Sequence, residues 1–364
     1  MRKKIALFIS SLNKGGSERV LVNLAEYFFS QGYDVVIVTQ YRSDNEYEIS
    51  NGIKRVLSDI SKEEEGQNRG ANFWKRYKKL RGVWIKEKPD LILSFIGKNN
   101  LMAIMTSRFL DIPVVVSVRG EPTEEYYSRL LRLVAKTIFH LADGVVLQTR
   151  KCLSFFPKGI QKKAVILKNS LNPAFMCDVY KGEREKRIVA VGRVDANKNH
   201  EMIIRAFAGL AQRYSEYNLT IYGEGELRQK LILLAKQLGL SERVFLPGAV
   251  SDVADAIRKA EIFVLSSYTE GMPNTLLEAM ALGLCVISTD CPCGGPGEII
   301  ENGENGFLIQ PGDEKALSAA LQKLIDDREM MYKMGENASK VREDLNPEII
   351  NMTWKNYLDG IMNK

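Results

Sequence analysis

The apolar and polar positions of the first 170 residues alternate between two spacings. Short runs of apolar and β-branched residues predict buried strands at residues 4–10, 34–39, 91–95, 114–118, 144–148 and 164–168. Several of these runs are separated by longer segments with helical spacing, and in residues 17–31 the apolar side chains recur every three or four positions. Strands that alternate with helices predict a parallel sheet covered on both faces, so residues 1–170 are expected to form a doubly wound α/β domain.

The same alternation restarts after a break. Residues 171–187 contain proline, asparagine and a run of charges, which predicts a linker. Further strands are predicted at 188–191, 218–222, 244–247, 262–266 and 284–289, with helices at 200–214, 227–238, 251–260 and 274–282. Residues 188–346 thus make a second domain, and a helix at 347–361 is expected to pack back on the first. We expect two Rossmann-like domains facing each other across an interdomain cleft, because open α/β sheets bind ligands at the carboxyl ends of their strands.

Length and composition are typical of a cytoplasmic globular protein. The 364 residues are enough for two domains of ordinary size. No apolar run approaches the roughly 20 residues of a spanning helix, and the run at 5–9 is too short for a signal-peptide core. The five cysteines are odd in number and lack zinc-like spacing, which favours a reducing compartment and no metal site, although Cys291 and Cys293 lie close together.

The net charge of +6 hides an asymmetry between the two halves. Residues 1–170 carry 29 Lys and Arg against 17 Asp and Glu, whereas the remainder carries 22 against 28. Residues 73–88 interleave aromatic side chains with cations, as a helix on an anionic membrane surface would. The alternative is a solvated helix whose Trp and Leu residues face the core. Nucleic acid is not an expected partner, because no recognition motif accompanies this stretch and the second half is acidic.

The segment 266–283 combines two acids with a helix start. Glu270 follows a predicted strand and Glu278 lies on the first turns of the next helix. Between them, Gly271 allows the backbone to approach a ligand, and Pro273 pre-sets the turn into the helix. The backbone amides at the helix start are expected to be unpaired and to bind an anion; they belong to Asn274, Thr275 and Leu276.

Other loops at strand ends carry candidate phosphate ligands. Arg193 and Lys198 follow the first strand of the second domain, where two fixed cations would meet a diphosphate. Gly15 and Gly16 form a glycine-rich turn between the first strand and helix. The turn lacks the third glycine of a dinucleotide fingerprint, and its lysine precedes the glycines, unlike that of a P-loop. Gly223 belongs to a weaker glycine signal of the same kind.

Four segments of the chain combine into a specific pattern. They are GGSER at 15–19, GRVDANKNH at 192–200, YGEGELR at 222–228 and GMPNTLLEAMALG at 271–283, the last preceded by Glu270. Over nearly its whole length the chain resembles the retaining glycosyltransferases of family 4, which have the GT-B fold. The resemblance implies that Arg193 and Lys198 hold the donor diphosphate, that Glu278 accepts the ribose hydroxyls and that Glu270 contacts the transferred sugar. It also implies that the turn from Gly271 through Met272, Pro273, Asn274 and Thr275 to Leu276 binds sugar and phosphate, and that Gly15 and Gly16 approach the diphosphate and acceptor.

One departure from the family concerns a first-domain histidine. Many relatives carry it in the loop after the strand at 114–118, where this chain has Arg119 and Glu121. Arg119 is expected to contact the transferred sugar or phosphate instead, and Glu121 the acceptor. The only histidines are His140, expected to be packed within a helical apolar run, and His200 at the helix start of the diphosphate loop.

The resemblance therefore implies a retaining hexosyltransferase, and the fixed cations near the helix start predict that it needs no metal. The expected donor is a UDP-sugar carrying a hexose or N-acetylhexosamine, and no cofactor is expected, since the chain has no Asp-x-Asp motif. The expected acceptor is a glycan, lipid-linked through polyprenyl diphosphate, at the inner face of the plasma membrane. The alternatives are a nucleotide-sugar 2-epimerase, an NAD-dependent oxidoreductase, which the broken fingerprint disfavours, and a non-catalytic sugar-nucleotide-binding or membrane-scaffold protein.

Overall fold

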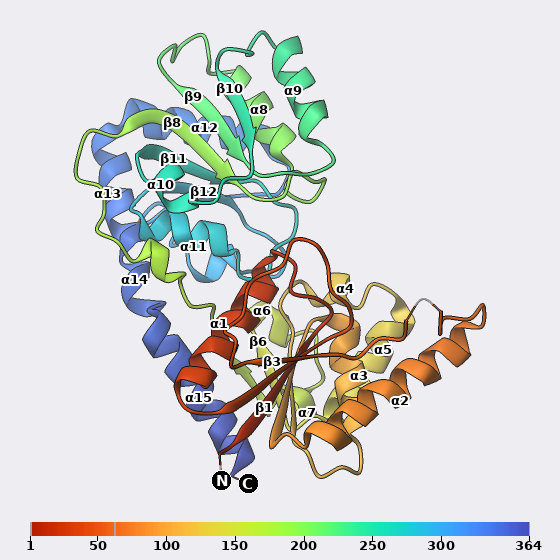
Figure 1. Ribbon diagram of the computed structural model, residues 1–364. Helices are drawn as coiled ribbons and strands as arrows, with labels where there is room; N and C mark the ends of the chain where they lie inside the picture. The colour runs from red at the N-terminus through yellow and green to blue at the C-terminus, as the bar shows by residue number, and fades with distance from the viewer. Residues whose placement is uncertain (1, 62, 364) are drawn as a thin grey trace. The chain divides into compact units, whose positions relative to one another are not determined.

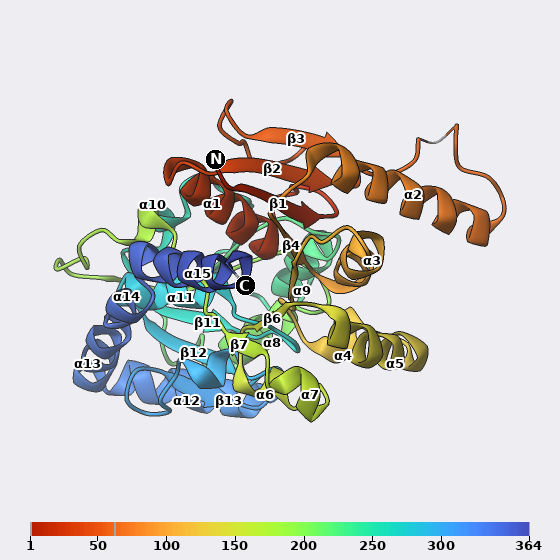
Figure 2. The same ribbon diagram turned by 90° about the horizontal axis from the view of Figure 1, so that it is seen from below.

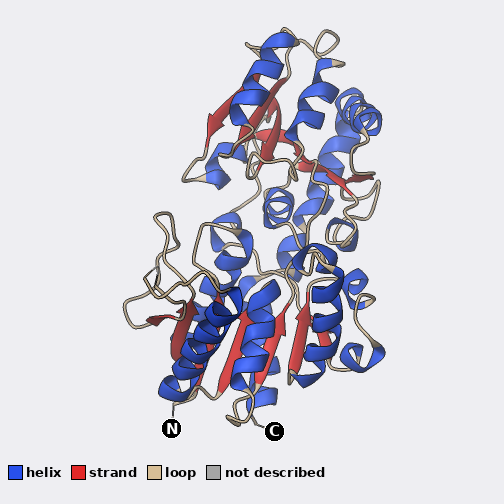
Figure 3. Ribbon diagram, turned by 90° about the vertical axis from the view of Figure 1, so that its right-hand side faces the viewer, coloured by secondary structure: helices blue, strands red, loops and turns tan. Residues whose placement is uncertain are grey.

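The computed structural model describes residues 2–61 and 63–363, and its chain divides into two compact units (Figure 1). The first unit comprises Met1–Asn169 together with Glu348–Lys364, and the second comprises Ser170–Pro347. In each unit, helices cover the strands of a parallel sheet (Figure 3). Each unit is described by itself below.

The first unit is built on a seven-stranded parallel sheet within the described residues, in the order β3-β2-β1-β4-β5-β6-β7. The strands are β1 (Lys4–Ile9), β2 (Asp34–Thr39), β3 (Lys54–Leu57), β4 (Leu91–Phe95), β5 (Val114–Ser117), β6 (Gly144–Leu147) and β7 (Ala164–Ile166). The helices are α1 (Gly16–Ser30), α2 (Arg69–Glu87), α3 (Gly97–Ser107), α4 (Pro122–Glu125), α5 (Arg129–Ile138), α6 (Arg150–Leu153), α7 (Lys158–Gln161) and α15 (Pro347–Met362). The order reverses between β1 and β4, which is where open α/β sheets bind ligands.

The two faces of this sheet are covered by different helices (Figure 2). Side chains of α1 and α15, including Phe28 and Trp354, pack with Ile5 and Leu7 of β1 in one core cluster. The opposite face of β1 carries Phe8, whose ring meets Trp84 of α2 edge-on at 5.9 Å between centroids. The alternation of β1 side chains between two apolar layers explains why this strand reads as a continuous apolar run.

The second unit repeats the architecture with a six-stranded parallel sheet in the order β10-β9-β8-β11-β12-β13, again counted over the described residues. The strands are β8 (Glu185–Val191), β9 (Asn218–Tyr222), β10 (Val244–Gly248), β11 (Ala260–Leu265), β12 (Cys285–Thr289) and β13 (Phe307–Ile309). The helices are α8 (His200–Ala208), α9 (Arg228–Gln237), α10 (Val253–Ile257), α11 (Asn274–Ala281), α12 (Glu314–Asp326), α13 (Arg328–Ser339) and α14 (Val341–Asp344). One core lies between the sheet and α8, α9 and α12, while α11 packs against β11 and β12.

Some element boundaries differ from the sequence prediction. The strand expected at 188 begins earlier, at Glu185, inside the segment predicted as a linker. Its start is fixed by Arg184, whose buried guanidinium donates to the carbonyls of Arg258, Ala260 and Leu282 at 2.8 to 2.9 Å. The edge strands β3 and β13 were not predicted, because each is short and half-exposed and so lacks a distinct apolar run.

Two further expectations concerned helices. His140, predicted to be packed, is exposed in a 3-10 turn, and its neighbour Phe139 is the buried residue. In helix α2, Trp84 and Leu80 face the core, as the solvated-helix interpretation of residues 73–88 expected, while Trp74 is exposed. Across the described part of the chain, no helix combines the length and apolar character needed to cross a bilayer.

Candidate active site

The candidate donor site lies at the point where the strand order of the second unit reverses. Strands β8 and β11 are neighbours there, although five elements separate them in the chain. The loop of residues 192–199 leaves the carboxyl end of β8, and the loop of residues 266–273 leaves that of β11. Parallel strands bring these two sequence motifs to the same edge of the sheet, as the prediction required.

The two loops bring Lys198 and Glu270 into direct contact. The Lys198 Nζ lies 2.5 Å from Glu270 Oε1, and each side chain is only 14% exposed. The Ser267 hydroxyl donates to the same carboxylate oxygen at 2.6 Å. A half-buried pair of this kind is held in one geometry by its surroundings, so the ammonium and the carboxylate present fixed charges at the sheet edge.

Asn197 joins the two loops through several hydrogen bonds. Its side-chain amide donates to the Thr269 carbonyl at 2.9 Å, and its carbonyl oxygen accepts from the Thr269 amide and hydroxyl at 3.0 and 2.8 Å. The Ser266 hydroxyl adds a bond to the Lys198 carbonyl at 2.7 Å. Sequence reasoning gave Asn197 no role, although it lies within the quoted motif. Its function is to set the spacing at which Lys198 meets Glu270.

Arg193 is not part of this cluster. Its side chain is 76% exposed and forms an ion pair with Asp195 at 3.3 Å. Asp195 also accepts from the Lys198 amide at 3.0 Å, which fixes the turn between the two cations. The structure therefore brings together Lys198 and Glu270 of the four predicted catalytic residues, and leaves Arg193 extended into solvent beside them.

Helix α11 begins at Asn274, directly after the loop that carries Glu270. Pro273 is its N-cap and Met272 before it is buried. The amide of Leu276 donates to the Pro273 carbonyl at 3.1 Å, so the prediction of an unpaired amide there is wrong: the first turn tightens toward 3-10 geometry and uses that donor internally. Glu278 is buried one turn further along the helix.

Glycines allow the backbones of this region to approach one another closely. A Cβ on Gly223, whose φ is +140°, would lie 1.8 Å from the Gly192 carbonyl oxygen. A Cβ on Gly295 would lie 1.6 Å from the carbonyl oxygen of Gly271. Gly223 was predicted as a ligand-binding residue; the contact that the structure shows for it is with the loop that carries Lys198. Gly295 was not singled out from the sequence.

His200 is the first residue of α8 and follows Lys198 by two positions in the chain. The imidazole is buried, and its Nδ1 has no hydrogen-bond partner within the described residues. Burial lowers the pKa of His200 to about 4, and the nearby Lys198 cation acts in the same direction. His200 is therefore neutral at physiological pH and adds no charge beside Lys198.

In the first unit, the glycine turn stands at the start of α1. Gly15 is the N-cap and Gly16 the first helical residue. The segment after β2 holds this turn through two hydrogen bonds. The Lys14 amide donates to the Asn45 carbonyl at 3.2 Å, and the Glu46 carboxylate accepts from the Leu12 amide at 3.3 Å. A strong ion pair with Arg55 lowers the pKa of Glu46 to about 2. This support comes from residues that the sequence pattern did not mark.

Arg119 lies at the carboxyl end of β5 with its guanidinium buried. The Nη2 atom donates to Asn169 Oδ1, and the guanidinium carbon lies 4.9 Å from the centre of the Phe95 ring. Its Nε and Nη1 atoms have no hydrogen-bond partner among the described residues. Burial lowers the pKa of Arg119 to about 9, and the Glu125 carboxylate opposes that shift. The result is an under-coordinated cation in a partly apolar setting, which suits an anionic ligand.

Glu125, which sequence reasoning missed, holds the Arg119 loop in place. Its carboxylate accepts from the backbone amides of Gly97, Arg119 and Gly120, each at 2.7 Å. Gly97 is the first residue of α3, which follows β4, and Arg119 and Gly120 follow β5, so one side chain connects the segments after these two strands. Glu121, which was predicted to contact the acceptor, caps α4 by accepting from the Thr123 amide at 3.3 Å.

Comparisons with known proteins agree with this architecture. Residues 14–175 match the family model described as Glycosyltransferase Family 4, and residues 178–341 match the model described as Glycosyl transferases group 1. The two matches together span most of the chain. The protein is therefore a glycosyltransferase. It belongs to glycosyltransferase family 4 and has the GT-B fold.

Similar proteins extend over nearly the full length. A Campylobacter jejuni protein named N-acetylgalactosamine-N,N'-diacetylbacillosaminyl-diphospho-undecaprenol 4-alpha-N-acetylgalactosaminyltransferase is 28% identical over 93% of this chain and 94% of its own. The amylovoran biosynthesis glycosyltransferase AmsD of Erwinia amylovora is 22% identical over 99% of this chain and 100% of its own. Among solved structures, sucrose-phosphate synthase from Thermosynechococcus elongatus has a TM-score of 0.85 at 18% identity, with all of both chains covered. Anabaena HepE in complex with UDP-glucose has a TM-score of 0.81 at 18% identity, over 98% of this chain and 99% of its own.

Proposed function

We propose that this glycosyltransferase moves a hexose or N-acetylhexosamine from a UDP-sugar to a glycan carried on polyprenyl diphosphate, with retention of anomeric configuration and without a divalent metal. The observation that carries the proposal is the Lys198–Glu270 pair, held by Asn197 beside the start of α11 at the strand-order reversal of the second unit. A cation, a carboxylate and a helix N-terminus in one place fit a sugar diphosphate, whose phosphates need positive charge and whose sugar hydroxyls need acceptors.

The proposed reaction breaks the bond between the anomeric carbon and the diphosphate oxygen. Negative charge grows on the leaving diphosphate, where Lys198, the exposed Arg193 and the dipole of α11 can stabilise it. The acceptor hydroxyl oxygen bonds to the anomeric carbon on the same face, and its proton passes to an oxygen of the departing phosphate. Glu270 positions the sugar, and the buried Glu278 takes the ribose hydroxyls.

Arg119 is proposed to replace the histidine that many relatives carry in the first domain. Its unpartnered Nε and Nη1 donors suit a phosphate or the transferred sugar better than a neutral imidazole would. Gly15 and Gly16 would allow the same ligand to approach the α1 start. Retained turnover in an Arg119→Ala variant would exclude this role.

The names and titles of similar proteins support the proposed substrate class. The Campylobacter relative is named for a diphospho-undecaprenol-linked acceptor, and the HepE structure is titled as a complex with UDP-glucose. The basic first half of this chain suits an acceptor at an anionic membrane surface. Peripheral attachment at the cytoplasmic face of the membrane is part of the proposal.

The donor is best identified by ligand-induced stabilisation. UDP-glucose, UDP-N-acetylglucosamine, UDP-galactose, UDP-N-acetylgalactosamine and the corresponding GDP-sugars would each be added during thermal unfolding, because a ligand of the folded state raises Tm by mass action. We expect one UDP-sugar to raise Tm in the parent protein and to do so less in Lys198→Ala. Stabilisation by GDP-sugars alone would contradict the uridine assignment.

Turnover separates transfer from epimerisation. A transferase should release UDP only when a lipid-linked glycan is supplied. A 2-epimerase acts without an acceptor and yields the C2 epimer of the nucleotide sugar or, where water takes the place of the acceptor, the free epimeric sugar and UDP. Donor binding without turnover on any acceptor would favour the non-catalytic alternative.

A further inference from the structure

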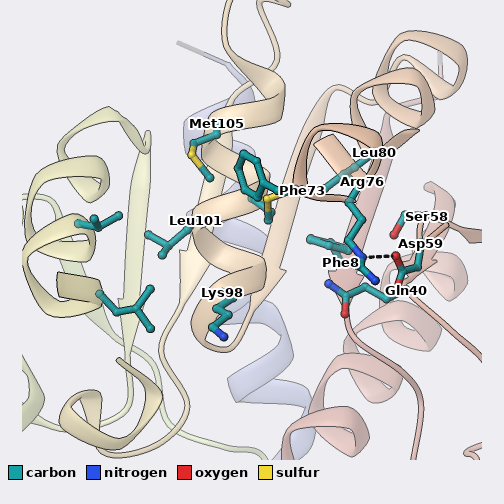
Figure 4. Close-up of a pocket in the computed structure, with 13 residues that line it drawn as sticks. Phe8, Gln40, Ser58, Asp59, Phe73, Arg76, Leu80, Lys98, Leu101 and Met105 are labelled. Carbon is teal, nitrogen blue, oxygen red and sulfur yellow. Dashed lines mark hydrogen bonds and ion pairs between the residues drawn. The ribbon is translucent and has the colours of Figure 1, made fainter. Parts of the chain in front are cut away.

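A pocket of about 470 Å³ opens in the first unit beside the carboxyl edge of its sheet (Figure 4). It lies between α2, α3 and α5, and Phe8 of β1 forms part of its wall. Its volume falls within the range of small-molecule sites, roughly 300 to 1,000 Å³. None of the predicted site residues lines it, so it is separate from the residues assigned above.

The pocket has one polar end and one apolar end. Gln40, Ser58 and Asp59 gather on one side together with Arg76, whereas Leu101 and Met105 line the other side (Figure 4). The other apolar side chains of the lining are Phe73, Leu80, Met102, Leu131 and Val134, of which Leu80 lies beside Arg76 (Figure 4). Methionine side chains adapt to irregular hydrocarbon shapes, so this part suits a flexible chain better than a flat ring.

The charged residues at the pocket differ in their partners. Arg76 is neutralised by Asp59 at 2.7 Å and Glu65 at 2.9 Å. Lys98, on the first turn of α3, contacts the Tyr127 hydroxyl at 3.2 Å and has no carboxylate within ion-pair distance among the described residues. Lys98 therefore supplies a cation that an anionic head group at the sheet edge would neutralise.

Helix α5 connects the pocket to the surface. Leu131 and Val134 line the pocket, whereas Leu130 and Leu133 on the same helix are 69% and 63% exposed. The same helix carries Arg129, Arg132 and Lys136. A short basic helix that exposes leucines is typical of a lipid interface, with its cations at the head groups.

We propose that this pocket takes the isoprenoid chain of the polyprenyl-linked acceptor, with its phosphate near Lys98. The inference rests on the proposed function, because it assumes that the acceptor is a polyprenyl lipid. An isoprenoid phosphate is the occupant that matches this lining. Its phosphate would meet Lys98 on the first turn of α3, at the edge where substrates of open sheets bind, and its hydrocarbon would reach the Leu and Met residues. A phospholipid of the bilayer is not a reactant, so its head group does not have to lie at the edge of the sheet where reactants bind.

The test measures binding of farnesyl monophosphate to the full-length protein by calorimetry, without any nucleotide sugar. Leu131→Gln places an amide in the apolar wall, and Val134→Phe fills part of the volume. Leu133→Gln makes the same chemical change as Leu131→Gln on the same helix but outside the pocket. We expect about tenfold weaker binding in the first two variants and less than about twofold change in the third.

Four controls decide between occupants. Equal Tm values for the variants and the parent would show that Leu131→Gln and Val134→Phe still fold. If Leu131→Gln does not fold, Val134→Phe alone tests the pocket. Equal losses in Leu131→Gln and Leu133→Gln would indicate surface adsorption and overturn the proposal. If inorganic phosphate binds as tightly as farnesyl monophosphate, the hydrocarbon chain contributes nothing to binding, and this outcome would also overturn the proposal. If vesicles of phosphatidylglycerol and phosphatidylcholine compete with farnesyl monophosphate for the protein, the occupant is a phospholipid, and the proposal is overturned.

Failure of this inference is distinguishable from failure of the proposed function. A protein that is stabilised by a UDP-sugar but does not bind farnesyl monophosphate would lack the isoprenoid pocket and remain a sugar-nucleotide enzyme. A protein that binds farnesyl monophosphate but no nucleotide sugar would contradict the proposed donor instead.

Discussion

The carboxyl edges of the two sheets differ although both units are parallel and doubly wound. In the second unit, the edge is built by two short motifs that the Asn197 side chain joins, and Lys198 is paired with a carboxylate. In the first unit, the edge is built by single residues from distant segments, with an under-coordinated Arg119 and a pocket with an apolar wall. The rigid, charged edge of the second unit suits the diphosphate that we propose as donor, whereas the varied surfaces of the first edge suit the amphiphilic acceptor that we propose.

The strongest test of the second edge is Lys198→Ala. We expect turnover to fall on the order of a hundredfold, because one fixed donor to a developing anion contributes about 3 kcal/mol to the barrier. Steady-state kinetics with donor and acceptor would measure it. Lys230→Ala, an exposed cation paired with Glu201 in the same unit, is the matched control and should retain activity. A loss below about tenfold in Lys198→Ala would remove its proposed role.

The interlocked backbones of the second edge are tested by Gly223→Ala. The added methyl group would collide with the Gly192 carbonyl, and a φ of +140° is unfavourable for alanine. We expect the free energy of unfolding to fall by about 2 kcal/mol, measured by urea titration. Gly82→Ala is the control, since a Cβ there meets no atom within 4 Å and lies inside α2. Equal stability of the two variants would show that the loops do not interlock in solution.

Arg119→Met separates stability from function in the first edge. A buried cation with two unused donors costs free energy, so the change should leave Tm unchanged or raise it. The same change should reduce kcat/KM about tenfold, because a hydrogen bond to a charged group contributes about 1.5 kcal/mol. Thermal unfolding and steady-state kinetics on the same samples would measure both effects. A lower Tm with normal kcat/KM would make Arg119 structural and remove the contrast between the two edges.

The smallest expected effect concerns pH and His200. Because its pKa in the folded protein is about 4, against 6.5 for an ordinary histidine, the unfolded chain binds more protons between these values. The free energy of unfolding should therefore fall as the pH drops through this window, by about 1 kcal/mol between pH 8 and pH 5.5. Urea titrations of the parent and of His200→Gln at both pH values would measure it. The same decrease in both proteins would assign the acid sensitivity to other groups.

Much of the donor site could be read from the sequence because it depends on local order. The residues of GRVDANKNH and GMPNTLLEAMALG are contiguous, and each follows a strand that reads as a continuous apolar run. Parallel strands in a doubly wound sheet all end at one edge, so predicting the strands was enough to predict that Lys198 and Glu270 would be near each other. The helix starts of α8 and α11 were predicted at the residues where they lie.

Other features were decided only by tertiary structure. Asn197, Glu125 and Gly295 are ordinary residues in the sequence, and each acquires its role by contacting a loop distant in the chain. The pocket with its apolar wall depends on three helices that pack side by side, and no single helix predicts it. Local spacing determines which side chains share a face, but chain folding determines which faces meet. The sequence by itself therefore determined the parallel strands and the charges at the carboxyl edge of the second sheet, and the tertiary structure decided how those charges are paired and where the pocket with an apolar wall forms.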